Sequence, residues 1–320
     1  FSPYQRNLLV ICLFVLLTLP PLFYLYERPV DIYYRLATIA LIFSTTINFT
    51  LAILILIGNP RSEVHKFFSL LTALIGVWCF TNLGSQVSLT ASQAYIWGQL
   101  TIVAPIFITA LYLHITYIFP SKLPLNRRQK FYIYLPVILL LPLVPTRWNI
   151  ITLHEGFSGE PGILYFFFTI YFVIYFSFSF FRLLRSKKDA EVKIRQQINI
   201  IFIGSLCTAI IGITANSILP LMGVRSLYIY GTPSAIIFST AVTYALLRYQ
   251  FLNFRTYITV ENIIRFIAFI ATIGIAVFVS LWLVFLDLHL VTLIYSFVML
   301  GIFFPLVVYP ALIDLLTKSS

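Results

Sequence analysis

Six polar or aromatic residues that lie inside apolar segments are the first candidates for chemistry in this chain. They are Trp78, Asn82, Gln86, Gln99, Thr101 and Tyr112. The first three follow one another at intervals of four residues, so they share one face of a helix. The indole of Trp78, the amides of the Asn and Gln residues and the hydroxyls of Thr101 and Tyr112 form hydrogen bonds without carrying a charge. The chemistry that fits such a set is recognition of a ligand in a pocket shared by two neighbouring helices.

The same six residues have a second interpretation. A polar side chain in lipid is costly, so it turns toward the interior of a helix bundle. Hydrogen bonds between helices are common there and help to hold membrane bundles together. The sequence leaves both interpretations open, a ligand pocket and polar helix packing.

Catalytic and metal-binding patterns are missing from the sequence. None of the 10 acidic residues lies well inside an apolar segment. The four histidines are far apart and lack the spacing of metal ligands. The chain contains no GxSxG, HExxH, Walker or Rossmann motif. We therefore expect no catalytic residue, no metal site and no cofactor in this chain.

The composition indicates which elements must position the six candidates. Of the 320 residues, 60% are hydrophobic and 10% are charged, which is more apolar surface than one soluble domain of this size can bury. A helix needs about 20 mainly apolar residues to cross a bilayer. Ten segments meet this requirement, at residues 8–26, 36–57, 67–88, 95–119, 131–147, 162–183, 198–219, 227–247, 264–286 and 290–313. The predicted fold is an all-α, polytopic transmembrane helix bundle of about ten spans, with the lipid bilayer as its first partner.

The fifth segment, 131–147, is the weakest of the ten because it is short and contains Pro136, Pro142 and Pro145. The basic loops on either side of the fifth and sixth segments, at 120–130 and 182–197, both favour the cytoplasm. The chain between them therefore has to cross twice. We expect the fifth segment to be a real but kinked span.

The basic residues predict the orientation of the chain. Of the 21 lysines and arginines, 17 fall at one side of the predicted spans and 4 at the other. Cytoplasmic loops carry the excess of such residues, so both termini are expected in the cytoplasm and the chain is expected to be a multi-pass protein of the cell inner membrane. Because the basic residues lie in short loops between apolar spans, we do not expect a nucleic-acid partner.

A junction divides the predicted spans into a bundle and a following hairpin. We expect an N-terminal anchor helix at 1–35, a seven-helix unit at 36–254 and a two-span hairpin at 255–320. The segment between the last two is amphipathic and can lie along the membrane surface as a short, rigid connector. The residues expected to transmit a change there are Arg248, Tyr249, Phe251, Phe254 and Arg255.

Short motifs carry a resemblance to a known family. The stretch from Tyr244 to Arg255 reads Tyr-Ala-Leu-Leu-Arg-Tyr-Gln-Phe-Leu-Asn-Phe-Arg. Further motifs are Asn59-Pro60-Arg61-Ser62, Phe304-Pro305-Leu306 and Ile313-Asp314-Leu315-Leu316. Together with Trp78, they resemble the N-terminal membrane region of bacterial multi-span sensor histidine kinases and related signalling proteins. The resemblance implies that the second to eighth spans form a seven-helix sensor unit.

The resemblance also implies a function for the chain. We expect the membrane-embedded input module of a bacterial signal-transduction receptor, which senses a small or hydrophobic ligand, a peptide or the state of the membrane. It would pass that signal to a cytoplasmic output domain beyond this chain. Among output domains, a histidine kinase is the main expectation. The receptor would form a homodimer through that domain. This chain itself is not expected to be an enzyme. The alternatives are a small-molecule permease and a membrane-embedded transferase; missing charge at mid-membrane weighs against the first and missing catalytic groups against the second.

Overall fold

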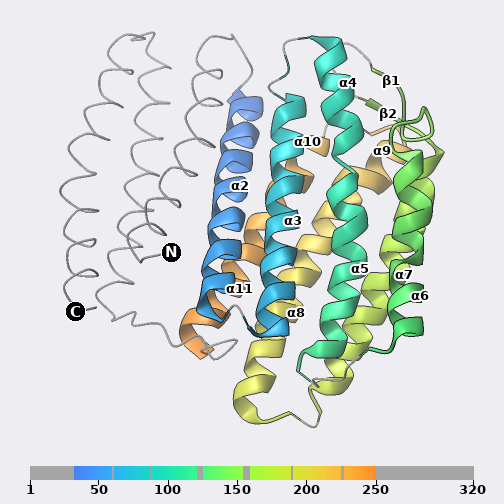
Figure 1. Ribbon diagram of the computed structural model, residues 1–320. Coiled ribbons are helices and arrows are strands. Elements are labelled where there is room, and N and C mark those ends of the chain that lie inside the picture. Colours follow the sequence, from blue (N-terminus) through green and yellow to red (C-terminus); the bar gives the residue numbers. More distant parts are fainter. Residues whose placement is uncertain are drawn as a thin grey trace, which may run out of the picture. The chain divides into compact units, whose positions relative to one another are not determined.

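The computed structural model describes residues 32–249, apart from gaps at residues 60, 87, 89, 121–124, 154–158, 189 and 225–226. Within these residues the chain forms an α-helical bundle with one small strand pair (Figure 1). Most of the predicted anchor, 1–35, and all of the predicted hairpin, 255–320, lie outside the described residues. The predicted spans at 8–26, 264–286 and 290–313 lie outside them too.

The described helices follow one another as long rods joined by loops (Figure 1). Their bounds are α2 Ile32–Gly58, α3 Glu63–Gln86, α4 Ala91–Leu100, α5 Val103–Ile118, α6 Arg127–Leu140, α7 Ile163–Ser186, α8 Val192–Ile213, α9 Leu219–Leu221, α10 Tyr228–Gly231 and α11 Ala235–Tyr249. A π-helical turn at Thr214–Ile218 continues α8 into α9, and a 3-10 turn at Thr232–Ser234 continues α10 into α11. α4 and α5 are interrupted only at Thr101 and Ile102, because Pro105 has no N–H to donate to the Thr101 carbonyl.

Five described rods are long and apolar enough to cross a membrane, at Ala37–Leu56, Glu63–Gln86, Ala91–Ile118, Ile163–Ser186 and Val192–Leu221. A sixth helix, Thr232–Leu246, is apolar but shorter. These six correspond to the spans predicted at 36–57, 67–88, 95–119, 162–183, 198–219 and 227–247, so the predicted helices are confirmed over these ranges.

The span predicted at 131–147 is wrong in its second half. The helix begins earlier than predicted, at a capping box: the Asn126 side chain accepts a hydrogen bond from the Gln129 N–H at 2.8 Å, and the Gln129 side chain accepts one from the Asn126 N–H at 3.0 Å. It ends at Leu140, where a 3-10 turn containing Pro142 follows. Pro142 and Pro145 cannot donate backbone hydrogen bonds, so the α-helix does not continue.

Buried hydrogen bonds and apolar contacts hold the rods together. The Ser69 hydroxyl of α3 donates to the Ala52 carbonyl of α2 at 2.7 Å. The Ser239 hydroxyl of α11 donates to the Asn48 side-chain oxygen of α2 at 2.9 Å. On the other side of the bundle, α5, α6 and α7 share a hydrophobic cluster that includes Ile106, Ile133, Leu164 and Tyr171. α2 is thus joined to both α3 and α11.

A small sheet closes one end of the bundle. β1 (Ile150–Leu153) pairs antiparallel with β2 (Gly159–Pro161) in the loop between α6 and α7, an element that the all-α prediction did not include. The buried Asn149 fixes this loop to α4, because its amide donates to the Gln99 carbonyl at 3.0 Å. The Gln99 amide donates in turn to the Thr146 carbonyl at 3.4 Å. We call this end of the bundle the sheet end.

The opposite end carries the loops that join α2 to α3, α5 to α6 and α7 to α8 (Figure 1), and we call it the basic end. Its described basic residues include Arg61, Lys66, Arg127, Arg128, Lys130, Arg185, Lys187, Lys188, Lys193 and Arg195. At the sheet end the described basic residues are Arg35 and Arg147. The fold therefore gathers at one end the loops from which a cytoplasmic orientation was predicted.

Candidate functional site

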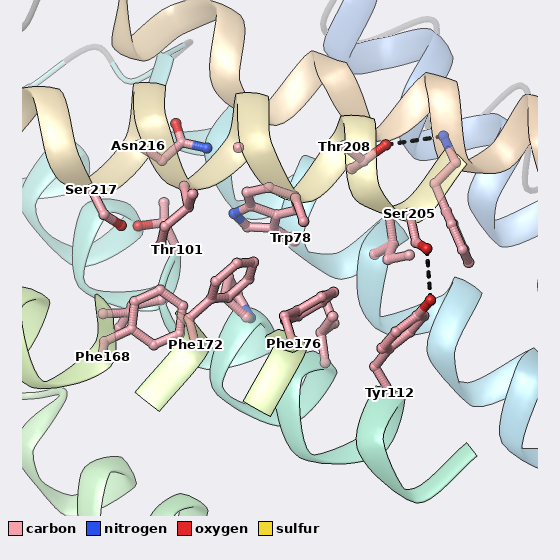
Figure 2. A pocket seen from close by; sticks show the side chains of 18 of the residues that line it. Trp78, Thr101, Tyr112, Phe168, Phe172, Phe176, Ser205, Thr208, Asn216 and Ser217 are labelled. Carbon is pink, nitrogen blue, oxygen red and sulfur yellow. Dashed lines mark hydrogen bonds between the residues drawn. The ribbon is translucent and has the colours of Figure 1, made fainter. Parts of the chain in front are cut away.

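A cavity of about 80 Å³ lies between α3, α5, α7 and α8, and α10 and α11 contribute to its wall (Figure 2). It is therefore built from segments that are far apart in the sequence. Its lining residues are Leu71, Ile75, Trp78, Thr101, Ile102, Pro105, Ile108, Tyr112, Tyr165, Phe168, Phe172, Phe176, Ser205, Thr208, Ala209, Gly212, Ile213, Asn216, Ser217, Tyr228 and Phe238.

A column of aromatic rings on α7 forms one wall of the cavity. Phe168, Phe172 and Phe176 follow at intervals of four residues, so they lie above one another on one helix face. The rings of Phe172 and Phe176 stack with their centroids 4.2 Å apart. Tyr112 of α5 stacks directly on Phe176, with centroids 4.9 Å apart and planes 11° apart. This column ties α5 to α7 and gives the wall a flat, apolar surface.

On the side nearer the basic end, the polar groups of the cavity are already paired. The hydroxyls of Tyr112 and Ser205 are 2.6 Å apart and joined by a hydrogen bond (Figure 2). Ser205 also donates to the Ile201 carbonyl at 2.6 Å. A serine hydroxyl has one proton, so Tyr112 is the donor in the bond to Ser205. These two hydroxyls satisfy each other and the backbone.

On the side nearer the sheet end, the cavity gathers hydroxyl groups. The Tyr165 hydroxyl interacts with Thr101 and Tyr228. Thr101 donates to the Gly98 carbonyl at 2.7 Å, which leaves its oxygen able to accept a further bond. Ser217 is 2% exposed and lines the cavity near Thr101 (Figure 2), and its hydroxyl makes no hydrogen bond with another described residue. This side therefore retains hydrogen-bonding capacity.

The π-helical turn Thr214–Ile218 presents two polar residues here. Asn216 interacts with the rod of α10 and α11. Its amide nitrogen donates to the Tyr228 carbonyl at 3.1 Å, and its amide oxygen accepts from the Thr232 N–H at 3.3 Å. Ser217, the next residue, also lines the cavity. π-helical turns are rare and recur at functional sites.

The cavity carries no charge. None of the described residues that line it is acidic, basic or a histidine. Within the part of the chain that the structure describes, no group of three or more His, Cys, Asp or Glu side chains could hold a metal ion. The arrangement can bind by shape, by apolar contact and by neutral hydrogen bonds.

Three of the six predicted site residues line this cavity, namely Trp78, Thr101 and Tyr112. Trp78 projects into it from α3 between its two polar sides (Figure 2). The Gly212 position on α8 lies against the Trp78 ring, since a Cβ there would be 3.4 Å from it. These three predicted residues, from two adjacent rods, are thus brought together.

The other three predicted residues lie outside the lining and hold neighbouring elements. Asn82 accepts a hydrogen bond from the Tyr228 hydroxyl at 3.3 Å, directly behind the cavity. Gln86 accepts one from the Thr38 hydroxyl of α2 at 3.0 Å. Gln99 anchors the loop that carries the small sheet. Their contacts fit polar packing, and ligand binding by any of the six remains a prediction.

Sequence reasoning missed the aromatic column of α7 and the cavity residues of α8 and α10. The signal for the column was present, because the phenylalanines recur every four residues. Ser205, Ser217 and Tyr228 gave no comparable pattern, since single hydroxyl residues are ordinary in membrane helices. Only the packing of the rods brings them to one cavity.

Residues spaced by four on α8 join the cavity to α11. At Gly204, an added Cβ would lie 2.3 Å from the Ala241 Cβ, so the two helices touch there. Thr208, which lines the cavity, donates to the Ser234 carbonyl at 3.2 Å and accepts from the Phe238 N–H at 3.1 Å (Figure 2). One hydroxyl thus bridges the first turn of α11.

Comparison with known families gives a match that spans about two thirds of the chain. The model of the N-terminal 7TM region of histidine kinase matches residues 40–255. The chain belongs to this family. Comparisons with curated proteins and with solved structures give no match.

The 7TM region of histidine kinases is a membrane-embedded sensory input region, so membership confirms the predicted resemblance and favours signalling over the permease and transferase alternatives. The family accounts for seven spans, not the ten predicted, and seven of the ten predicted segments fall in the matched part or at its edge. α11 ends at Tyr249. The predicted junction residues Phe251, Phe254 and Arg255 lie outside the described residues, as do the side chains of Arg248 and Tyr249, so the junction remains a prediction.

Proposed function

We propose that this 7TM sensor region receives its signal in the cavity between α3, α5, α7 and α8, and that α11 passes the signal on. The observation that carries the proposal is the double role of Thr208. Its side chain lines the cavity, and its hydroxyl is hydrogen-bonded to the Ser234 carbonyl just before α11 and to the Phe238 N–H in the first turn of α11. Any ligand that moves Thr208 must also move or release that turn.

The contact between α8 and α11 makes such coupling effective. The Gly204 backbone lies directly against Ala241, and Phe238 reaches from α11 into the cavity wall. Packed helices respond to a displaced neighbour by moving as units, because protein interiors are dense and do not absorb strain smoothly. α11 is therefore expected to move with α8, because the two helices are joined at the start of α11 through Thr208 and again further along through Gly204 and Ala241.

A ligand shifts the bundle only if it binds two arrangements of the helices with different affinities. In the simplest scheme, an occupied cavity favours one position of α11 and an empty cavity favours another. A shift of the population from 1:99 to 99:1 requires a difference in affinity of about 10⁴-fold between the two states. The bridging hydroxyl of Thr208 is the group through which this difference would reach α11.

The same proposal covers the orientation of the chain in the membrane and its connection to the output domain. The basic end faces the cytoplasm of a bacterial cell, both termini lie there, and three further spans outside residues 40–255 bring the total to ten. α11 continues into a rigid junction at 248–255 and a hairpin at 255–320, which lead to a cytoplasmic histidine kinase domain that dimerises. The gathering of basic residues at one end and the family match support these points.

The experiment is a substitution of Thr208 in the full-length receptor. Thr208→Val keeps the shape of the side chain and removes the hydroxyl that bridges Ser234 and Phe238. We expect the variant to insert and fold but to hold kinase activity at one level, whatever the stimulus. Thr208→Ser, which keeps the hydroxyl, is the matched control and should respond. A Thr208→Val receptor with a normal dose response would overturn the proposed coupling.

A further inference from the structure

We propose that the cavity binds a neutral, unbranched alkyl chain with one uncharged polar group at its end. This rests on the proposed function, in which the cavity is the input site. The chain would lie along the helices, with its polar group toward the sheet end and its tail toward the Tyr112–Ser205 pair. A diffusible signal and a membrane lipid can both supply this chemistry, and the experiment below separates the two sources.

The absence of charge in the wall excludes ionic ligands. No described lining residue carries a charge, and the cavity lies among membrane-length helices. Transfer of an unpaired charge to such an environment is strongly unfavourable. A carboxylate, sulfate or quaternary ammonium group would find no partner here, whereas a hydroxyl or carbonyl group would.

The dimensions of the cavity select a narrow, extended molecule. Its lining runs from Thr101, just before α5, to Tyr112 of α5, and from Tyr165 to Phe176 along α7. Eleven steps of helical rise in each case correspond to a length of about 16 Å. The cavity volume of about 80 Å³ is the space open to the centres of water-sized spheres. A volume this small, lined by residues over that length, favours a narrow ligand over a bulky one.

An alkyl chain fits this cavity. Carbon atoms in contact are separated by about 3.5–4.0 Å, so a single alkyl chain is slim enough to lie in a narrow space of this kind. Single bonds of about 1.5 Å that meet at about 111° advance about 1.25 Å per carbon, so about 16 Å takes a chain of roughly ten to twelve carbons with its end group. The aromatic column of α7 and Trp78 then contact the methylene groups from two sides.

The two sides of the cavity differ in what they can still bind. Tyr112 and Ser205 satisfy each other, so this side offers little to a polar group. On the side of the sheet end, Ser217 lines the cavity beside Thr101 and has no hydrogen-bond partner among the described residues. A buried polar group without a partner is unfavourable, so a ligand hydroxyl or carbonyl is best placed beside Ser217 and Thr101.

The experiment uses brominated probes, which quench tryptophan fluorescence at short range. The full-length receptor, with Trp97, Trp148, Trp282 and every tryptophan of the output domain changed to Phe, is placed in lipid nanodiscs so that emission reports Trp78. 11-Bromo-1-undecanol should quench it saturably, and shorter 1-bromoalkanols should bind about fourfold more weakly per methylene removed. Undecyl sulfate and undecyltrimethylammonium should not compete, whereas 1-undecanol should.

Substitutions assign the binding to the cavity. Ser217→Ala should weaken 11-bromo-1-undecanol several-fold and leave 1-bromoundecane unchanged. Ser179→Ala is the matched control, because Ser179 is equally buried on α7 but bonds to the Tyr175 carbonyl and does not line the cavity. Competition by the charged compounds at equal strength, or quenching that only rises linearly with probe as in free partitioning, would overturn the proposal.

Two further outcomes separate the sources and the two proposals. Mass spectrometry of the purified receptor tests for a bound neutral alkyl chain. If such a molecule copurifies and 1-undecanol displaces it, the source is a membrane lipid. If 11-bromo-1-undecanol binds and no such molecule copurifies, the source is a diffusible signal. Both outcomes support the alkyl chain. If 11-bromo-1-undecanol binds saturably while Thr208→Val signals normally, the proposed coupling fails and the ligand class stands. If Thr208→Val uncouples the receptor but only charged probes bind, the ligand class fails alone.

Discussion

Replacing Gly204 by alanine tests the contact between α8 and α11. A Cβ at Gly204 would lie 2.3 Å from the Ala241 Cβ, whereas carbon atoms in contact are about 3.5–4.0 Å apart. The two helices would have to separate locally by about 1.2–1.7 Å to accept one methyl group. Overpacking of this kind costs about 1–3 kcal/mol, which exceeds the gain of up to about 1 kcal/mol in helix propensity from glycine to alanine. Gly204→Ala should therefore lower the stability of the sensor region.

The assay is thermal unfolding of the full-length receptor in lipid nanodiscs, read by the ellipticity of the helices. Ala241→Gly should restore part of the stability lost in Gly204→Ala, with a coupling of about 0.5–3 kcal/mol between the two sites. Gly212→Ala is the matched control, because a Cβ there meets the Trp78 ring at an ordinary 3.4 Å and should cost nothing. If Gly204→Ala were as stable as the wild type, or if Ala241→Gly failed to help it, the close contact would be refuted.

Three further predictions follow from the site and its surroundings. Tyr112→Phe should destabilise the region by about 0.5–1.5 kcal/mol in the same unfolding assay, since it removes one buried hydrogen bond while Ser205 keeps its bond to the backbone; a loss above about 3 kcal/mol would mean that the ring, not the hydroxyl, had been disturbed. Single cysteines at Arg127 and Arg147 should react with an impermeant maleimide only from the cytoplasmic and only from the outer side, respectively, and the reverse would invert the proposed topology. Insertion of three glycines after Gln250 should leave the receptor folded but unresponsive, and a full response would make the junction a passive linker.

The sequence predicted the helices well because crossing a membrane imposes a length and a composition that can be counted. It failed at 131–147, where apolar composition continues past Leu140 but the prolines do not allow the α-helix to continue. Hydropathy reports burial in lipid, and only backbone hydrogen bonding decides where a helix ends.

The sequence could not predict which neighbouring helix each polar residue of α3 contacts. Trp78, Asn82 and Gln86 share a face of α3, yet Trp78 turns to the cavity, Asn82 to Tyr228 and Gln86 to α2. A spacing of four residues identifies a shared face, but over two helical turns that face meets several partners. Which partner each residue contacts depends on the packing of rods that are distant in sequence.

The π-helical turn at Thr214–Ile218 changes how any residue-by-residue scan of α8 must be interpreted. The Leu219 N–H bonds to the Thr214 carbonyl, five residues back, so the rod contains one residue more than a regular α-helix of the same pitch would need. One residue corresponds to about 100° of rotation, so the face that Gly204, Thr208 and Gly212 present cannot be extrapolated by steps of four beyond the turn. Deleting one residue within the turn would remove that extra residue and restore regular α-helical spacing, so α9 would keep its place on the rod and the residues before and after the turn would follow one continuous phase. The turn thus lets a single rod present two faces that follow different phases of the sequence.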